Sequence, residues 1–226
     1  MTSPFRDPGI PDGERSSYAV KLGDKAFRSN VVSVVTSVED RYVSTIDGRI
    51  GDRFSMSIEQ TFLRASGLLR ADRYKAESRF DENVVSREEG FFLETRHLQF
   101  GGRVQPFPTG LMPLVGGLTL LRGLDFTKGA KATIDLWLAF SVCWPLETKI
   151  EKRASIEVPA GRFDAWQVRV RPSFHVINGL LDKVVAGLLP PFILHFETTA
   201  PHRMLSFSFP TGPMPWDPRA MIELTG

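Results

Sequence analysis

One stretch near the middle of the chain constrains the fold most, because it contains a complete β-hairpin. Residues 154–171 read ASIEVPAGRFDAWQVRVR. Pro159 presets the backbone for a turn, and Gly161 supplies a left-handed position at little cost. Beyond the turn, apolar residues at 166, 168 and 170 alternate with polar ones, which is the period of a half-buried strand. Similar hairpins follow along the chain, so the sequence predicts one large antiparallel sheet.

The predicted fold is therefore mainly β: a single large antiparallel β-barrel, or a strongly curled sheet, of about ten strands. Two long strands are expected at residues 68–80 and 84–100, with a turn at 81–83. Strands of this length are typical of barrels and coiled sheets. Three short strands, at 192–198, 203–209 and 220–224, are expected to end the chain. Residues 1–13 form an extended N-terminal arm, and residues 14–226 form one barrel-like domain.

Two segments depart from the strand pattern. Residues 105–125 are apolar but interrupted by Pro113 and by Gly116-Gly117, which excludes a regular helix throughout. We expect an apolar loop here, with a short helix around 114–121, that is either a plug closing one barrel end or a mobile lid over a cavity. Residues 176–189 carry apolar side chains at three- and four-residue spacing and precede Pro190-Pro191, which predicts a helix.

Composition excludes several classes of protein. A net charge of +2 over 226 residues argues against a dedicated nucleic-acid binder. Cys143 is the single cysteine, so no intrachain disulfide can form, and its apolar surroundings indicate a small buried side chain. No apolar run is long enough for a membrane-spanning helix. Because residues 1–13 lack the apolar core of a signal peptide, we expect a cytoplasmic protein.

Metal and cofactor motifs are not recognisable in the sequence. The four histidines lie on different predicted elements, without the paired spacing of a zinc site. The glycine pairs do not fit a phosphate-binding or dinucleotide-binding fingerprint. We therefore expect no metal and no cofactor, and the oligomeric state stays open.

Three motifs together resemble a known family. They are Asp12-Gly13-Glu14 before the first strand, IEVPAGRFDAWQV at 156–168, and FETTAPHRMLSFSFPTGP at 196–213. Their order and spacing resemble an uncharacterised family of bacterial β-rich proteins, which are lipocalin-like or lipoprotein-carrier-like. The resemblance implies an antiparallel, barrel-like fold and no established catalytic residues. This chain departs from the family in lacking an export signal, and its late strand begins Leu194-His195-Phe196-Glu197 where the family has a tryptophan-containing sequence.

Polar residues on apolar strands are the candidate catalytic groups. In the strand at 68–80, strict alternation would place residues 69, 71, 73, 75, 77 and 79 on one face. If that face is solvated, Tyr74 and Phe80 point inward; if it faces inward, it brings Glu77 into the interior. Asp135 lies in a strand that is apolar on both faces, and the remaining candidates share one face of a late strand: His195 and Glu197. An outer ion pair or a satisfied core hydrogen bond is the simpler interpretation of each.

Large apolar and aromatic side chains are the candidate ligand contacts. They are Tyr74, Trp137, Phe140, Trp166 and Phe196. Tryptophan is as common in cores as in pockets, so this assignment alone does not separate a cavity from a filled interior.

Three hypotheses about function follow. The first is binding of a hydrophobic small molecule, of isoprenoid, fatty acyl or polyketide type, in a barrel cavity. The second is a cofactor-independent enzyme, a cyclase or isomerase, that folds such a ligand and needs one acid or base. The third is an interaction module with a filled core. A uniformly apolar cavity wall favours the carrier, and an acid or base in the wall favours the enzyme.

Overall fold

The protein forms one large β-sheet of sixteen strands. The computed structural model describes residues 3–99, 102–103, 111–113, 117–139, 142–173, 190–212, 214 and 216–226. Along the sheet the strands follow the order β10-β11-β12-β13-β14-β15-β16-β1-β3-β4-β5-β6-β7-β8-β9, with β2 paired to β1. Neighbouring strands are antiparallel, except that β10 and β11 are parallel.

The first nine strands are β1 (Glu14–Leu22), β2 (Lys25–Ala26), β3 (Ser29–Val38), β4 (Arg41–Ile50), β5 (Phe54–Ala65), β6 (Leu68–Phe80), β7 (Asn83–Phe91), β8 (Arg96–Gln99) and β9 (Gly102–Arg103). The rest of the chain gives β10 (Leu111–Pro113), α1 (Gly117–Leu121), β11 (Lys131–Ala139), β12 (Val142–Val158), β13 (Gly161–Pro172), β14 (Phe192–Glu197), β15 (Met204–Pro210) and β16 (Arg219–Leu224).

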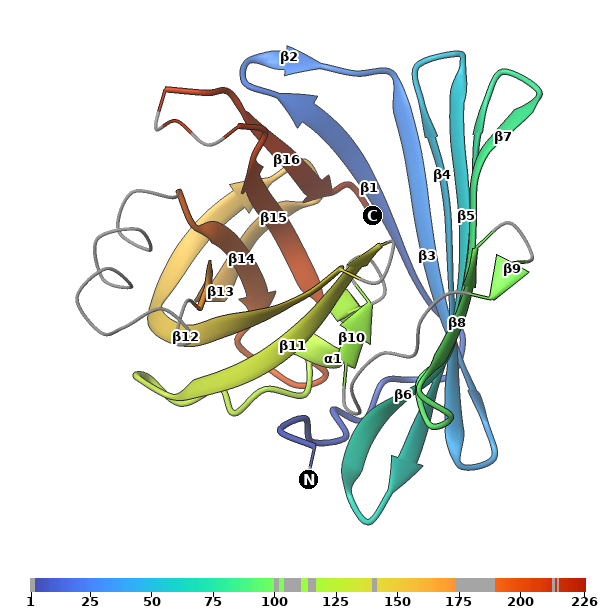
Figure 1. Ribbon diagram of the computed structural model, residues 1–226. Coiled ribbons are helices and arrows are strands. Elements are labelled where there is room, and N and C mark those ends of the chain that lie inside the picture. The colour runs from blue at the N-terminus through green and yellow to red at the C-terminus, as the bar shows by residue number, and fades with distance from the viewer. Residues whose placement is uncertain are drawn as a thin grey trace.

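The sheet has two parts that face each other. Strands β3 to β7, here called the wall, stand nearly upright on one side of the molecule, and β11 to β16, here called the curl, bend into a trough opposite (Figure 1). Strand β1 joins the two parts, and α1 lies between them. The outermost strands, β9 and β10, form no ladder with each other in the described residues. The sheet is therefore barrel-like but not closed.

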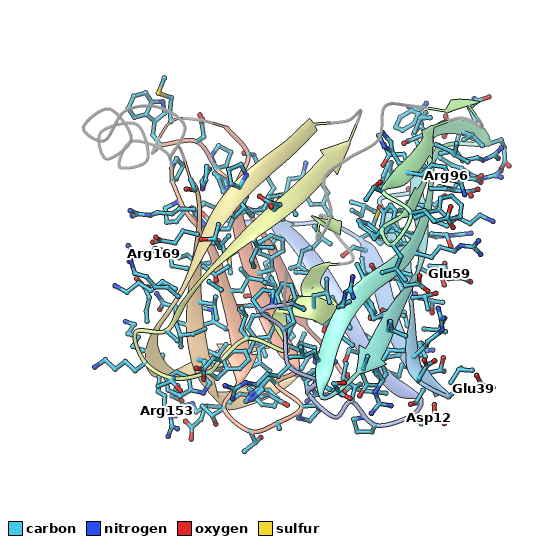
Figure 2. The ribbon with its side chains drawn as sticks, turned by 60° about the horizontal axis from the view of Figure 1, so that its bottom comes forward. Asp12, Glu39, Glu59, Arg96, Arg153 and Arg169 are labelled. Atoms are coloured by element: carbon cyan, nitrogen blue, oxygen red, sulfur yellow. The ribbon has the colours of Figure 1, made fainter. Side chains whose placement is uncertain are left out.

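Apolar side chains alternate into the space between wall and curl, which we call the interior. Tyr42, Ile58 and Phe62 of the wall and Leu194 and Phe196 of the curl each have 1% or less of their surface exposed. Charged residues point the other way: Figure 2 shows Glu59 on the outer side of the wall and Arg169 on the outer side of the curl. This is the period-two pattern of a sheet with one dry and one wet face.

The mainly β, antiparallel prediction is confirmed, and the strand count is corrected. The central hairpin is present as β12 and β13, with Gly161 at φ 130° after the turn. The three short final strands also lie within one residue of their predicted limits. The described residues contain sixteen strands instead of about ten, partly because four strands have only two to four residues. The predicted strand at 84–100 is divided into β7 and β8 by a turn in which Thr95 has a φ of 50°.

The outer face predicted for residues 73, 75, 77 and 79 is confirmed, but residues 69 and 71 do not share it, because a β-bulge interrupts the alternation. Thr61 pairs with Arg73 and Phe62 pairs with Ala71, so Asp72 is the extra residue. Residues 69 and 71 therefore face the interior together with Tyr74, and residues 73, 75, 77 and 79 face outward. Phe80 does not point inward: it is 43% exposed, and the Arg53 guanidinium lies 4.3 Å above its ring.

The two departures from the strand pattern fall partly outside the described residues. The helix predicted at 176–189 lies wholly outside them. In the apolar stretch at 105–125, residues 111–113 and 117–125 are described. They contain α1 at Gly117–Leu121, within the range expected for a short helix, and Leu120 and Leu121 are buried.

The N-terminal arm bridges the gap between the wall and the segment after α1. The Leu69 amide donates to the Phe5 carbonyl (2.9 Å), and the Arg6 amide donates to the Gly123 carbonyl (2.7 Å). A Cβ atom at position 123 would clash with the Arg6 carbonyl oxygen, which explains the glycine there. Phe5 and Ile10 are each only 4% exposed. The arm therefore fills an opening that the sheet itself does not close.

Removing the arm's apolar anchor is expected to destabilise the whole domain. Phe5→Ala removes a ring that belongs to the buried core and should lower the free energy of unfolding by about 3–5 kcal/mol. Denaturant unfolding measures the change. Val38→Ala, at a position that is 51% exposed, is the matched control and should change stability little. Equal effects of the two substitutions would contradict a sealing role for the arm.

Candidate functional site

Residues from two of the recognisable motifs meet at one buried arginine. Arg122 Nη1 donates to Glu14 Oε1 (2.6 Å), and Arg122 Nη2 donates to Glu14 Oε2 (2.9 Å). Its Nε donates to the Pro201 carbonyl (2.9 Å). The side chains of Arg122 and Glu14 are only 6% and 15% exposed. This two-pronged geometry is the strongest form of an arginine–carboxylate pair, and it ties the segment after α1 to β1 and to the turn between β14 and β15.

Local backbone geometry places these groups. Gly13 has a φ of 73°, which suits glycine, and it turns the chain so that β1 begins at Glu14. The Arg122 amide donates to the Thr119 carbonyl (3.3 Å), so the side chain leaves the last turn of α1. The sequence contained a signal for this arginine: it is the single charged residue between 105 and 124.

His202 lies beside this pair in a strained conformation. Its φ is 55°, in the left-handed region that non-glycine residues seldom occupy. Its Nδ1 lies 2.9 Å from the Glu197 carbonyl oxygen, so Nδ1 carries the proton and donates it. The ring stacks against Phe126 with centroids 4.1 Å apart. Burial lowers the pKa of His202, and the Glu197 carbonyl opposes that shift in part.

A pocket of about 330 Å³, which we call the end pocket, lies around these residues. The arm contributes Arg6 and Asp7, the segment after α1 contributes Arg122 and Phe126, and the curl contributes Arg153, Trp166 and His202. The Arg153 guanidinium lies 4.6 Å above the Trp166 ring. Depressions of about 380 and 410 Å³ on the outer side of the wall are as large, so volume alone does not single this pocket out.

The interior holds a different kind of pocket, here called the apolar pocket. The residues that line it come from α1 and from five strands of the curl: Leu118, Leu121, Ile134, Leu136, Leu146, Thr148, Val170, Phe192, Leu194 and Phe207. Thr148 is the one polar residue among these ten, and its hydroxyl already donates to the Ala132 carbonyl (3.0 Å). The free volume is about 30 Å³, enough for one or two waters. Leu118 and Leu121 of α1 are the part of this lining that does not come from the curl.

The four predicted catalytic candidates do not face the apolar pocket. Glu77 lies on the outer side of the wall and pairs with Arg79 and Arg87. Asp135 is exposed between the buried residues Ile134 and Leu136.

The other two candidates lie on the face of β14 opposite to Leu194 and Phe196. His195 Nδ1 is 2.8 Å from Ser206 Oγ, and burial together with Lys152 lowers its pKa. Glu197 forms an ion pair with Arg203 at 2.8 Å. Each of these contacts is an ion pair or a hydrogen bond of the kind that the simpler interpretation of the sequence predicted.

Three of the five predicted ligand contacts lie on the inner face, and the side chains of the other two are not described. Tyr74, Trp166 and Phe196 are buried on the inner face, with 7%, 7% and 0% exposed. Trp166 lines the end pocket, and Phe196 packs edge-on against Phe126 at 5.6 Å. Trp137 belongs to β11, but its side chain is outside what the structure describes, and Phe140 is outside it entirely. Strand alternation identified the inner face but not the residues of the apolar pocket.

The described parts of the chain bear on two kinds of feature: a cluster of metal ligands and a membrane-spanning helix. No three histidine, cysteine or acidic side chains come close enough there to hold a metal ion. No helix among the described elements has the length and apolar character needed to cross a membrane.

The fold resembles known structures, whereas no protein-family model and no curated protein matches the sequence. A beta-barrel-like protein of domain of unknown function DUF1849 from Brucella abortus is similar with a TM-score of 0.55 and 11% identity, over 93% of this chain and 94% of that one. A protein with a YmcC-like fold from Bacteroides fragilis aligns over 98% of this chain and 97% of its own, at a TM-score of 0.36 and 8% identity. The first likeness is one of fold, and it agrees with the β-rich, barrel-like architecture.

Breaking the Arg122–Glu14 pair is expected to be costly. Glu14→Gln leaves a buried guanidinium without its counter-charge and should lower the free energy of unfolding by about 3–5 kcal/mol. The double variant Glu14→Gln/Arg122→Met removes both charges and should lose less than the sum of the single variants. Denaturant unfolding of all four proteins measures the coupling.

An exposed ion pair provides the control for this cycle. Glu157 and Arg162 lie 3.7 Å apart with 78% and 77% of their side chains exposed. Glu157→Gln should leave stability almost unchanged. Strict additivity at positions 14 and 122 would show that the two buried side chains do not depend on each other.

Protonation of His202 is expected to weaken the fold. Its folded-state pKa lies below the value of about 6.5 in the unfolded chain, so the unfolded chain takes up a proton first as the pH falls. The stability that neutral His202 contributes is complete above about pH 6.5 and is lost as the pH falls through that value toward the folded pKa. His202→Asn keeps a residue tolerant of the left-handed conformation. Its unfolding free energy should fall less between pH 7 and 5 than that of the wild type, whereas parallel curves would refute the assignment.

Proposed function

We propose that this protein binds a hydrophobic small molecule in the interior of the sheet, with α1 as a plug that the ligand displaces. The observation that carries the proposal is the lining of the apolar pocket, in which nine of ten residues are apolar and the hydroxyl of the tenth donates a hydrogen bond within the protein. Such a lining stabilises a ligand by removing apolar surface from water, at about 25 cal/mol per Å². It offers little to a charged or strongly polar ligand.

The plug is small and held at its polar end. Helix α1 has five residues, too few to be stable without its surroundings. Leu118 and Leu121 face the apolar pocket, and Arg122 anchors the following segment through Glu14. A ligand that takes the place of the two leucine side chains would restore their apolar contacts with the curl. The exchange therefore costs less than opening an empty cavity of the same size.

The lining of the apolar pocket favours a carrier over an enzyme. None of the residues described around the apolar pocket is an acid or a base. The four polar candidates from the sequence make outer or structural contacts instead. A cyclase or isomerase would need a proton donor or acceptor close to the ligand. A hydrophobic ligand of isoprenoid, fatty acyl or polyketide type, bound without reaction, is the function that the geometry supports best.

Shortening the plug should enlarge the site and increase uptake. Leu121→Ala removes three carbons from the wall of the apolar pocket and should raise the affinity for the neutral fluorophore N-phenyl-1-naphthylamine roughly tenfold, because about two more methylene-sized groups of the probe become buried. The substitution should also cost about 2–5 kcal/mol of stability. Fluorescence titration at low temperature, with the fold checked by circular dichroism, measures the affinity.

The matched control is a leucine buried elsewhere. Leu69→Ala, at a fully buried position on β6, should destabilise similarly without improving binding. If both variants take up the probe equally, uptake reports a loosened core rather than this pocket. If neither the wild type nor Leu121→Ala takes up the probe, the interior is filled and the proposal fails.

A further inference from the structure

A row of polar side chains crosses the inner face of the wall. Ser44 of β4 pairs directly with Gln60 of β5, and Gln60 pairs with Tyr74 of β6. Directly opposite residues of an antiparallel pair lie on the same face, so all three point into the interior. Their exposed fractions are 0%, 1% and 7%. We call these three residues the polar strip.

Gln60 stands out within the strip because its amide is unsatisfied. Among the residues that the structure describes, neither Oε1 nor Nε2 has a hydrogen-bond partner, although both atoms are fully buried. Arg169 and Arg203 also have a buried Nε without a hydrogen-bond partner, but each forms an ion pair through another atom. Glu223 Oε2 itself lies in an ion pair with Lys21, whereas Arg171 Nε and Ser173 Oγ, like the Gln60 amide, lack a partner among the described residues. On the same face of β5, the neighbours of Gln60 are Ile58 and Phe62, with 1% and 0% exposed. An apolar residue would suit this position better in the unliganded protein.

Helix α1 separates the polar strip from the apolar pocket. Thr119 Oγ1 lies 3.4 Å from Ser44 Oγ, so one side of α1 touches the strip. Leu118 and Leu121, on either side of Thr119 in the sequence, line the apolar pocket. A molecule that displaces α1 would meet apolar side chains of the curl on one side and the polar strip on the other. The interior is thus built for a ligand with a long apolar part and a small polar group.

We propose that Gln60 binds the polar head of the ligand, and that this head is an uncharged group carrying a hydrogen-bond donor beside an acceptor, as in a carboxamide or a protonated carboxylic acid. The inference rests on the proposed binding of a hydrophobic ligand and names its class. A primary amide side chain offers one acceptor oxygen and two N–H donors. A carboxamide or carboxylic acid head pairs with it through two hydrogen bonds and satisfies both orphaned atoms.

Two probes with the same acyl chain and different head groups separate the contribution of the head group to affinity from that of the tail. Dodecanamide carries both a donor and an acceptor, whereas methyl dodecanoate carries acceptors alone. Competition against N-phenyl-1-naphthylamine should give the wild type a preference of about tenfold for the amide over the ester, the worth of roughly one net hydrogen bond. Gln60→Met, which keeps the length of the side chain without its polar atoms, should abolish the preference, because the amide then loses both hydrogen bonds and the ester loses the one that its carbonyl accepts.

Stability supplies the second readout, because a binding residue and a structural one respond in opposite directions. Gln60→Met removes two unsatisfied buried atoms and should raise Tm by about 2–4 °C. Gln167→Met is the matched control: Gln167 donates to Glu151 Oε2 at 2.7 Å, so its loss should lower Tm and leave the preference intact.

The outcomes distinguish the inference from the function on which it rests. Uptake of the fluorophore with no discrimination between amide and ester, or with discrimination that survives Gln60→Met, would overturn the role of Gln60 and leave hydrophobic binding standing. A lower Tm for Gln60→Met with unchanged preference would make Gln60 a structural residue. Failure of every probe to bind would remove the proposed function itself.

Discussion

The buried ion pair between Arg122 and Glu14 is the interaction on which the interior depends. The two residues are 108 positions apart in the chain, and the arginine also holds the Pro201 carbonyl. Taking a guanidinium and a carboxylate out of water is costly unless each is fully paired, so the arrangement tolerates little displacement. It fixes the end of α1 against the first strand of the sheet. The leucines of α1 consequently face the curl while Thr119 faces the wall.

The apolar inner face of an open sheet of this size has to be shielded from water, and segments that are not strands shield it here. The free backbone groups of an edge strand and an exposed apolar face both invite unwanted association. The N-terminal arm lies along the start of β6 and bonds to Gly123, so it joins the wall to the segment that Arg122 anchors. The arm and α1 are therefore parts of one closure, and loosening either should expose the same interior.

The sequence predicted what depends on near neighbours in the chain. The hairpin around Gly161 and the three final strands were predictable because a turn residue and a period of two are local signals. The bulge at Asp72 was not predictable, because it reverses the faces of β6 without a break in the strand. The Asp72 carboxylate bonds Arg41 of β4, a partner that is distant in sequence. The partner of Arg122 is equally distant in sequence. A lone arginine among leucines signals that a counter-charge exists but not where.

The state of Gln60 also depends on residues that are distant in the sequence. Its place in the alternation of β5 put a glutamine on an apolar face, yet whether its amide would be satisfied depended on β4, β6 and α1. Polar residues that serve the fold end up with partners, as Thr148, His202 and Arg122 do. A buried amide with none lowers stability, and natural chains retain such groups where function needs them. Among the described polar groups of the interior, Thr148 and Arg122 are satisfied and hold the curl and the end of α1 in place, whereas the unsatisfied amide of Gln60 is the group that we propose for the ligand.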